Sequence, residues 1–597
     1  MMDTFIDGQV QRLQAMLYAK ARYEPETRFK HLYKYLTKRH WVEAALQQVC
    51  RNRGSRTPGI DGVTRCDVAR GPERERLITG IIEEIRTQTY RPQPTRRIYI
   101  PKSNGKWRPL GISTLKDRVV QQMVRALIEP IFEAHFLPCS YGFRPYRCTW
   151  DALAEIHHFL RYPCLYYTVI EGDIEDCFGS VSHTRLMREV RRHVIDDRLL
   201  TLIWKMLKAG VMENLRYFET EVGTSQGNIA SPLLANIYMH ALDAWLHTRF
   251  HAVGSRGRAK KARHGELAYV RYIRYCDDFV VLMRCTERQT LTLKQELTQF
   301  VSQELKMILN EEKTLITDVH DGFDFLGVRT FVAASRKDPA HILPYQIPAT
   351  KSVKAYRNKV RELTSPHYDY LTPAERLRTL NWLIQGWATY HRWGNAKKTF
   401  TDLSWWTIKK VHRMLRRYTN GVGKRATYKK YFRPVTECDN LKRWKQYTNW
   451  LTPSVEVGDG YRMGLLPMSV ISTAEYWKHR GSKIPLAYPL LNELQGGIDR
   501  HTSFYTAEEV VSKAEVNDWK IKGYETLYFL HRKEVFQRDA YTCTECGYRS
   551  QRKRDDINDL ECHHIDPQGG HGMKNLTTVC LSCHHRLTVK QASRIKS

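Results

Sequence analysis

The sequence lacks any apolar run close to the roughly 20 residues that a helix needs to cross a bilayer. It has neither an amphipathic basic anchor nor a lipidation motif. The N-terminal segment, Met1–Val10, has no basic region followed by an apolar stretch, so it does not resemble a secretory signal. We therefore expect a protein that is not secreted and has no membrane partner.

Acidic residues are scarce relative to basic ones. There are 63 Asp and Glu against 95 Lys and Arg, which gives a net charge of +32 over 597 residues. A surface this basic repels itself unless it meets a polyanion. Because basic side chains that displace counterions bind nucleic acids, nucleic acid is the partner that we favour, and a merely soluble basic protein is the alternative. The length predicts roughly three to five globular domains.

Cysteine is thinly spread except near the C-terminus. Most of the 14 cysteines occur singly, which is typical of a reducing compartment. Cys543 with Cys546 and Cys580 with Cys583 form two C-x-x-C pairs, which fit a structural zinc site with four cysteine ligands better than disulfides. The surrounding segment is short, so a zinc ion would offset part of the hydrophobic core that it lacks.

Two separate segments place Asp residues where β-prone runs end. Val270–Met283 holds two such runs around Asp277 and Asp278, which predicts a tight hairpin with two carboxylates at its tip. Asp also favours turns for purely conformational reasons, which is the structural alternative. Another strand-like run, Tyr166–Ile170, is followed by Asp173. Brought together, these carboxylates would bind two Mg²⁺ ions of the kind that catalyse nucleotidyl transfer.

An ordered series of short motifs extends over about residues 57 to 420. The motifs are PGIDGV at 58–63, IPKSNGKWRPLGI at 100–112, DRVVQ at 117–121, YGFRP at 141–145, GTSQGNIASPLLAN at 223–236, YCDD at 275–278, NEEKT at 310–314 and FLG at 325–327. With these motifs in this order, the chain resembles the group II intron reverse transcriptases. The resemblance implies a multidomain α+β fold, with right-hand polymerase fingers and palm, an antiparallel palm sheet and a helical thumb or maturase domain.

The resemblance also implies roles for single positions. Asp173, Asp277 and Asp278 match the catalytic carboxylates, which bind the metal ions together with the backbone carbonyl of Ile174. Phe178 matches the ring that excludes a 2′-hydroxyl and so selects dNTPs. The residues matched to binding of the incoming nucleotide are Lys102, Arg108, Gln226, Gly227 and Lys313. Without the resemblance, these five would be interpreted as ordinary surface or loop residues.

The segment after the palm is rich in Trp and basic residues. Residues 381–393 resemble the family's thumb or maturase segment, and residues 401–450 carry many Lys, Arg and aromatic side chains but few acidic ones. Basic side chains with interleaved rings line nucleic-acid grooves, whereas a solvated helix face over an aromatic core is the alternative. The resemblance implies group II intron RNA as the partner, in a ribonucleoprotein.

Histidine and asparagine residues lie between and beside the cysteine pairs in the order of the HNH endonucleases. That resemblance implies a zinc-stabilised ββα-metal domain in which His564 is the general base. His563 and His584 would hold one divalent cation, while Asn575 and Glu561 would support the site. A purely zinc-binding DNA module, with the histidines as bystanders, is the alternative.

These features predict five domains. They are a helical N-terminal extension (1–56), fingers and palm (57–340), thumb or maturase domain (341–450), a DNA-binding region (451–525) and an HNH endonuclease domain (526–597). The implied function is that of a mobile intron protein. Such a protein assists splicing, copies RNA into DNA with dNTPs as substrates, and nicks the second strand of target double-stranded DNA. The alternatives are a splicing-only maturase and another bacterial reverse transcriptase class fused to an HNH nuclease. We expect a bacterial cytoplasmic, nucleoid-associated protein or one of an organellar matrix.

Overall fold

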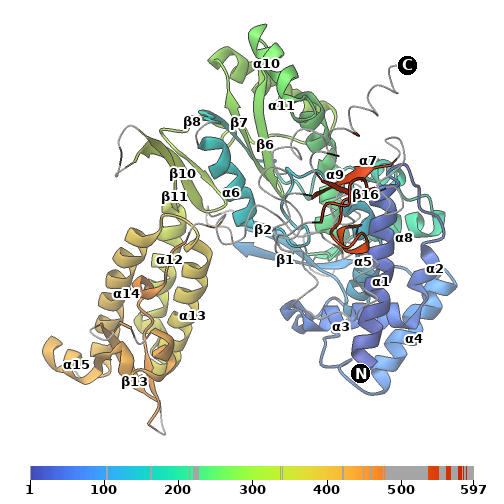
Figure 1. Cartoon of the computed structure of the whole chain (residues 1–597). Helices are drawn as coiled ribbons and strands as arrows, with labels where there is room; N and C mark the ends of the chain where they lie inside the picture. The colour runs from blue at the N-terminus through green and yellow to red at the C-terminus, as the bar shows by residue number, and fades with distance from the viewer. Residues whose placement is uncertain are drawn as a thin grey trace. The chain divides into compact units, whose positions relative to one another are not determined.

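Figure 1 shows the computed structural model of the whole chain, which divides into two units. The first comprises Met1–Arg480 with Leu486–Ser503, and the second comprises Gly481–Pro485 with Phe504–Ser597. Within the described residues, no helix is long and apolar enough to cross a membrane. The structure describes residues 2–101, 105, 107–161, 164–213, 216–218, 223, 227–335, 338, 341–419, 423–444, 446–447, 450–457, 460–474, 476, 488, 535–549, 560–565, 576–580, 583 and 587.

Helices fill the N-terminal part of the first unit. Helices α1 and α3 both pack against α5, and the buried indole of Trp41 donates a hydrogen bond to the carbonyl of Met123 (3.2 Å). This layer gives the first unit a large part of its core. The helices are α1 (Met2–Tyr23), α2 (Tyr33–Leu36), α3 (Arg39–Arg51), α4 (Pro72–Arg86) and α5 (Leu115–Glu133).

The palm is a four-stranded antiparallel sheet in the order β6-β7-β3-β8. Its central strand β7 is buried at every position between Asp278 and Arg284, which explains its continuous apolar sequence. The strands are β3 (Thr168–Gly172), β6 (Tyr269–Tyr275), β7 (Asp278–Arg284) and β8 (Ile316–Asp318). The associated helices are α6 (Thr149–Leu160), α7 (His183–Arg191), α8 (Asp197–Leu207), α9 (Ser231–Leu246), α10 (Ser255–Arg263) and α11 (Glu287–Gln303).

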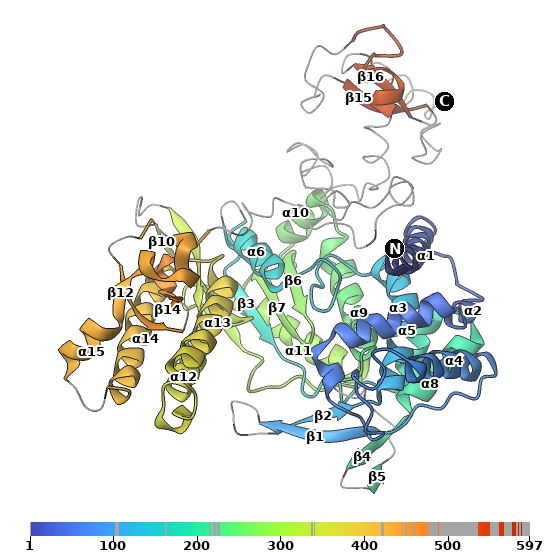
Figure 2. The same cartoon turned by 90° about the horizontal axis from the view of Figure 1, so that it is seen from below.

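The fingers form a second sheet, in the order β2-β1-β4-β5. β1 (Thr95–Pro101) and β2 (Trp107–Ile112) make a long antiparallel hairpin, which Figure 2 shows in blue. β4 (Val211–Glu213) runs parallel to β1, and β5 (Arg216–Phe218) is antiparallel to β4. The motif at 100–112 covers the end of β1 and the whole of β2, and the described strand residues nearest the tip of the hairpin, 99–101 and 107–109, are exposed.

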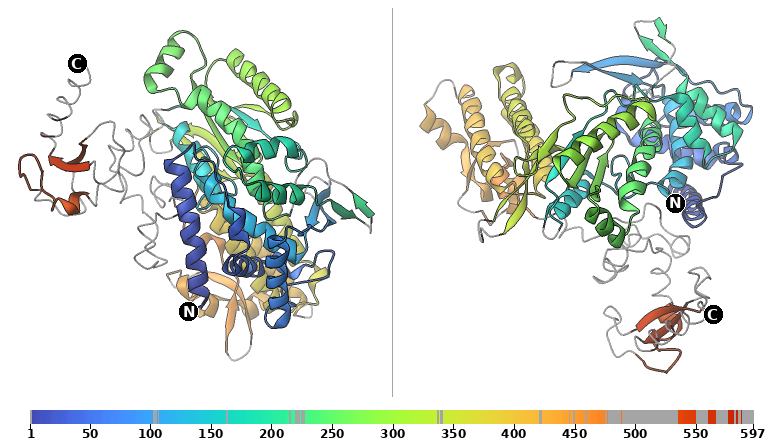
Figure 3. Two further views of the ribbon diagram at one scale, coloured as in Figure 1. Left: turned by 90° about the vertical axis from the view of Figure 1, so that its right-hand side faces the viewer. Right: turned by 90° about the horizontal axis from the view of Figure 1, so that it is seen from above.

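A small sheet leads from the palm into a helical domain that has its own hydrophobic core. Helices α12, α13 and α14 lie side by side in that core (Figure 3). The linking strands are β9 (Phe323–Phe325), β10 (Val328–Ala334) and β11 (Ile342–Pro348). The helical domain contains α12 (Thr350–Leu363), α13 (Pro373–His391), α14 (Lys397–Arg417), α15 (Lys424–Tyr431), β12 (Phe432–Pro434), β13 (Leu451–Glu456) and β14 (Arg462–Gly464).

Residues beyond 450, where the predicted thumb or maturase domain ends, also belong to the core of this helical domain. Val455, Met463 and Ile471 are buried against the helices, whereas the predicted domain division places them in a DNA-binding region (451–525). Short strands and turns of this segment pack against α13 and α14. Its buried side chains therefore follow neither a helical nor a strand periodicity in the sequence.

The described part of the second unit contains a two-stranded antiparallel sheet, preceded by a short helical turn (535–538) and a turn-rich segment that extends to residue 549. β15 (Leu560–His564) pairs with β16 (Leu576–Cys580), with His564 opposite Leu576. A small apolar cluster packs beside it, formed by Val535, Phe536, Leu560 and Leu576. A strand pair of this kind is compatible with the predicted ββα fold.

Candidate functional site

Three carboxylates converge at one end of the palm sheet. Asp173 directly follows β3, whose last residue, Gly172, pairs with Phe279 of β7. Asp277 lies in the tight turn between β6 and β7, and Asp278 is the first residue of β7. The hairpin predicted from the sequence is therefore present, and the neighbouring strand brings Asp173 beside it.

Close backbone contacts fix this carboxylate turn (Tyr275–Asp278). Cys276 adopts a left-handed conformation, with φ of 62°. A Cβ on Gly142 would lie 2.4 Å from both the backbone nitrogen and Sγ of Cys276, and a Cβ on Gly172 would lie 2.2 Å from the ring of Phe279. Only glycine permits approaches this close, so both glycines shape the site.

Negative charge accumulates at the three carboxylates. Although Asp278 is exposed, partial desolvation by surrounding protein, together with the charges of Asp277 and Asp173, raises its pKa to about 7. Desolvation also raises the pKa of Asp277, against the opposing positive charge of Arg108. Lys313 Nζ lies 2.6 Å from Asp173 Oδ2, and this hydrogen bond raises the pKa of Lys313.

The three carboxylates are suitable ligands for divalent metal ions. The clustered carboxylates are acceptors whose mutual repulsion a hard cation would relieve, and Mg²⁺ prefers such oxygen ligands. Asp173, Asp277 and Asp278 would hold the ions, and Ile174, the buried residue after Asp173, would add its carbonyl as the resemblance implies.

The residues expected at the incoming nucleotide lie partly on the fingers. Arg108 is exposed on β2, within electrostatic range of the carboxylates. Gly227 has a φ of 116°, and a Cβ there would lie 2.4 Å from the carbonyl oxygen of Gly111, so its loop touches β2. Lys102 and Gln226, also expected here, lie outside the described residues. Phe178 is half-buried and lines a small cavity that reaches the carboxylate turn.

A buried ion pair beneath the turn is not predicted from the sequence. Arg274 and Asp243 are fully buried, with Nη2 of Arg274 2.6 Å from Oδ2 of Asp243. Nη1 of Arg274 also donates to the carbonyl of Cys276 (2.8 Å) and to Oδ1 of Asn236 (3.0 Å). Arg274 follows the buried Tyr272 at the two-residue spacing of one strand face, so an arginine on an inward-facing position was the available signal.

The basic, aromatic segment mostly forms the core of the helical domain. Trp406 is half-buried, and three cations lie over its ring, with distances to the centroid of 5.6 Å for Arg357, 5.6 Å for Arg361 and 5.5 Å for Lys410. Other rings remain on the surface, among them Trp382, which is 67% exposed. Some rings therefore fill the core, as the alternative interpretation predicts, and others face solvent, while contact of these rings with nucleic acid stays a prediction.

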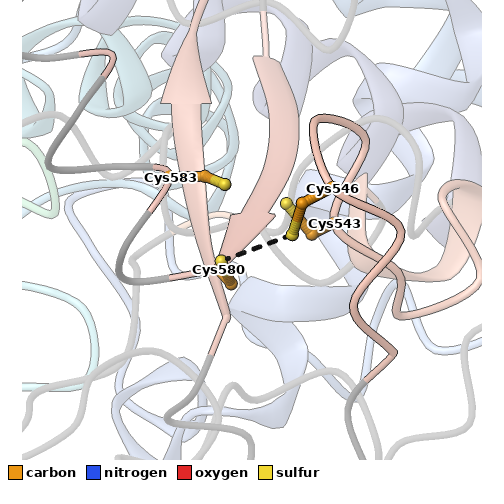
Figure 4. Close-up of side chains that lie close together, drawn as sticks. All are labelled: Cys543, Cys546, Cys580 and Cys583. Atoms are coloured by element: carbon orange, nitrogen blue, oxygen red, sulfur yellow. Dashed lines mark hydrogen bonds between the residues drawn. The ribbon is translucent and has the colours of Figure 1, made fainter.

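The four C-terminal cysteines come together as predicted (Figure 4). Their ligand atoms all lie within 4.8 Å of one another, and Sγ of Cys546 is 3.8 Å from Sγ of Cys580. A zinc tetrahedron with Zn–S bonds of about 2.3 Å has edges of about 3.8 Å, so the cluster is compatible with zinc. The four ligands are Cys543, Cys546, Cys580 and Cys583.

The expected nuclease residues are only partly described. Strand β15 contains Glu561, His563 and His564, and the side chain of His563 is buried. The side chains of Glu561 and His564 lie outside the described part of the chain, as do Asn575 and His584 entirely. The roles expected for these residues therefore stay predictions.

Two protein families match successive parts of the chain. Residues 100–330 match the reverse transcriptase (RNA-dependent DNA polymerase) family. Residues 353–432 match the maturase-specific domain of group II introns. The first match contains the three carboxylates, and the second covers helices α12 to α15 only in part, since it begins inside α12.

Three relatives show how far this similarity extends. Protein YkfC of Escherichia coli is 35% identical over 383 residues, which are 60% of this chain and 96% of YkfC. The group II intron-encoded protein LtrA of Lactococcus lactis is 35% identical over 346 residues, which are 50% of this chain and 56% of LtrA. A 91 kDa protein in the cob intron of Schizosaccharomyces pombe is 32% identical over 339 residues, which are 50% of this chain and 41% of that protein. The chain thus spans about half the length of LtrA and less than half of the yeast protein.

Proposed function

The chain belongs to the reverse transcriptases that carry a group II intron maturase domain, and we propose that it copies RNA into DNA at Asp173, Asp277 and Asp278. The observation that carries the proposal is the convergence of these carboxylates where β3 ends and the β6–β7 hairpin turns. Nucleotidyl transfer needs such a concentration of oxygen ligands around its metal ions.

Different residues of the chain would position the metal ions, the triphosphate and the sugar. Two Mg²⁺ ions at the carboxylates would supply activation of the primer 3′-hydroxyl and neutralisation of the triphosphate. Arg108 and Lys102 would bind the triphosphate from the fingers, where positive charge already reaches the site. Lys313 pairs with Asp173 in this structure, and we expect it to exchange that carboxylate for a phosphate when nucleotide binds. Phe178 would exclude a 2′-hydroxyl.

The polymerase assignment is tested by Asp277→Asn, which removes the charge and keeps the shape. With poly(rA)/oligo(dT) and dTTP, the variant should lose DNA synthesis by several orders of magnitude while it still binds RNA. Asp321→Asn is the matched control, because Asp321 is an exposed palm residue in another turn. Synthesis retained by Asp277→Asn would show that the carboxylates do another task.

We propose further that the helical domain binds group II intron RNA and assists splicing, in a ribonucleoprotein. The similarity to the maturase-specific domain supports this function. So do the exposed Trp382 and the cations gathered at Trp406, because rings and positive charge are what RNA-binding surfaces combine. A splicing assay with the intron RNA that surrounds the reading frame tests it, and splicing that is independent of the protein would contradict it.

For the C-terminal unit, we propose an HNH endonuclease stabilised by the four cysteines, which nicks the second strand of target double-stranded DNA during retrohoming. The close approach of the sulfur atoms supports the zinc ion, and the order of His563, His564, Asn575 and His584 in the sequence supports the nuclease. His564 would activate water while a single divalent ion would stabilise charge on the phosphate.

His564→Ala tests this second activity against the first. The variant should lose second-strand nicking on a target duplex but keep DNA synthesis on poly(rA)/oligo(dT). Retained nicking would instead favour a zinc-binding DNA module without cleavage by these histidines. Loss of both activities would show that the two units do not work independently.

A further inference from the structure

A second aromatic ring stands against the one proposed to select the sugar. The rings of Phe143 and Phe178 meet edge to face, with centroids 6.4 Å apart and planes at 72°. Both line the small cavity that also touches Cys276 and Asp277 of the carboxylate turn. Phe143 is 47% exposed, so its ring is not an ordinary core side chain.

The backbone at Phe143 is held in a costly conformation. Its φ of 59° lies in the left-handed region, which bulky side chains rarely adopt. Strain of this kind persists where surrounding contacts enforce it, and it concentrates at functional sites. An observed outlier beside the carboxylates therefore calls for a reason.

Contacts on both sides of Phe143 supply that enforcement. The carbonyl of the preceding Gly142 accepts a hydrogen bond from Nδ2 of Asn236 (2.8 Å). The following Arg144 forms a buried ion pair with Glu133, with Nη2 2.6 Å from Oε1. Because Gly142 also presses on Cys276, the loop is fixed to the carboxylate turn, and the ring of Phe143 has a fixed place against Phe178.

We propose that Phe143 is a positioning residue for sugar discrimination, which braces Phe178 from the side so that a 2′-hydroxyl meets a rigid ring. The inference rests on the proposed function of Phe178. A single half-buried aromatic side chain could rotate away from a ribose and admit it. An edge-to-face partner on a strained, anchored loop opposes that rotation. The strained backbone thus serves a purpose, since it aims the ring at Phe178.

The test compares dTTP with UTP on poly(rA)/oligo(dT), using full-length Phe143→Leu, Phe143→Gly and Phe143→Tyr. We expect Leu and Gly to lower the ratio of kcat/KM for dTTP over UTP by roughly threefold to tenfold, the range of an aromatic pair contribution. Tyr, which keeps the ring, should keep the ratio. Glycine also removes the left-handed strain, so its effect on selectivity should come without a matching loss of thermal stability.

Tyr146→Gly is the matched control. Tyr146 lies in the same loop with a φ of 57° and 45% exposure, but it does not line the cavity. Its replacement should relieve a similar strain and leave the dTTP-to-UTP ratio unchanged. An equal fall in this control would mean that loop strain, rather than the Phe143 ring, sets selectivity, and the inference would be wrong.

Phe178→Ala separates failure of the inference from failure of the proposed function. If Phe178→Ala lowers the ratio and Phe143→Gly does not, Phe143 has no bracing role and only the inference about Phe143 is wrong. If neither variant changes the ratio, the proposed exclusion of the 2′-hydroxyl by Phe178 is wrong as well. Equal losses with dTTP and UTP in the Phe143 variants would leave the ratio intact, assign Phe143 a structural role and overturn the inference.

Discussion

The carboxylate site of the palm and the cysteine site of the second unit are stabilised by opposite means. The palm site rests on a large hydrophobic core that extends from α1 to α11, with a fully buried Arg274–Asp243 pair under its turn. Among the described residues, the cysteine site has beside it small apolar clusters, such as Val535 with Phe536. The palm therefore shapes its ligands through packing of the chain, whereas we expect the cysteine site to depend on its metal for shape.

This difference also assigns different tasks to the metal ions. Metal ions at the palm would serve chemistry at a site whose backbone is already fixed by Gly142, Gly172 and the buried arginine. A zinc ion at the cysteines would serve folding, since the binding free energy of a structural metal becomes folding free energy in a small domain. Variants that remove the zinc site or the buried Arg274–Asp243 pair test this comparison.

Loss of the zinc site should have the largest effect. Cys543→Ser should abolish zinc binding and unfold the second unit, because structural zinc contributes about 10–16 kcal/mol in small zinc domains. Zinc analysis and limited proteolysis of the full chain measure this, with new cleavage expected after residue 535. Cys66→Ser, at an exposed single cysteine, is the control. DNA synthesis should survive in both, and a variant that stays protease-resistant without zinc would contradict the comparison.

Removal of the buried charge pair should have a smaller effect, confined to the first unit. Asp243→Asn leaves Arg274 charged and unpaired, and breaking a buried pair in this way costs about 3–5 kcal/mol. Urea unfolding should report that loss, DNA synthesis should fall because the carbonyl of Cys276 loses its fixed donor, and zinc content should stay unchanged. Asp321→Asn again serves as control, and equal stability of the two variants would show that the pair supports nothing.

The same comparison explains what the sequence could reveal. Asp277, Asp278 and the cysteine pairs stand out because their chemistry is tied to local spacing, and the hairpin and the cluster follow from it. Arg274 could not be assigned, because its partners come from α9 and from the loop before α6, far away in the chain. The same holds for Phe143, whose importance depends on a backbone angle and on a contact with a ring from another segment.

The segment after residue 450 illustrates a different limit. Its strands are short, and their apolar residues are spaced by turns rather than by a regular period. Val455 and Met463 are recognisable as core residues only once α13 and α14 are in place to cover them. Tertiary packing therefore decides the structure of this segment, and local pattern does not.

The smallest effect is expected at the surface of the helical domain, where neither a deep core nor a metal is involved. Lys410→Ala removes one of the three cations over Trp406, and a cation–π contact at an exposed site contributes about 0.5–1 kcal/mol. If RNA contacts this cluster, the slope of log affinity against log salt should also fall by about one. Lys424→Ala is the control, because it removes a positive charge at an exposed position, without a ring contact in the described residues. An effect on stability alone would show that the cations over Trp406 serve the structure of the domain. A change in salt slope confined to Lys410→Ala would instead show that RNA binds this cluster. The cluster would then be a third kind of site, which depends on neither a deep core nor a metal ion.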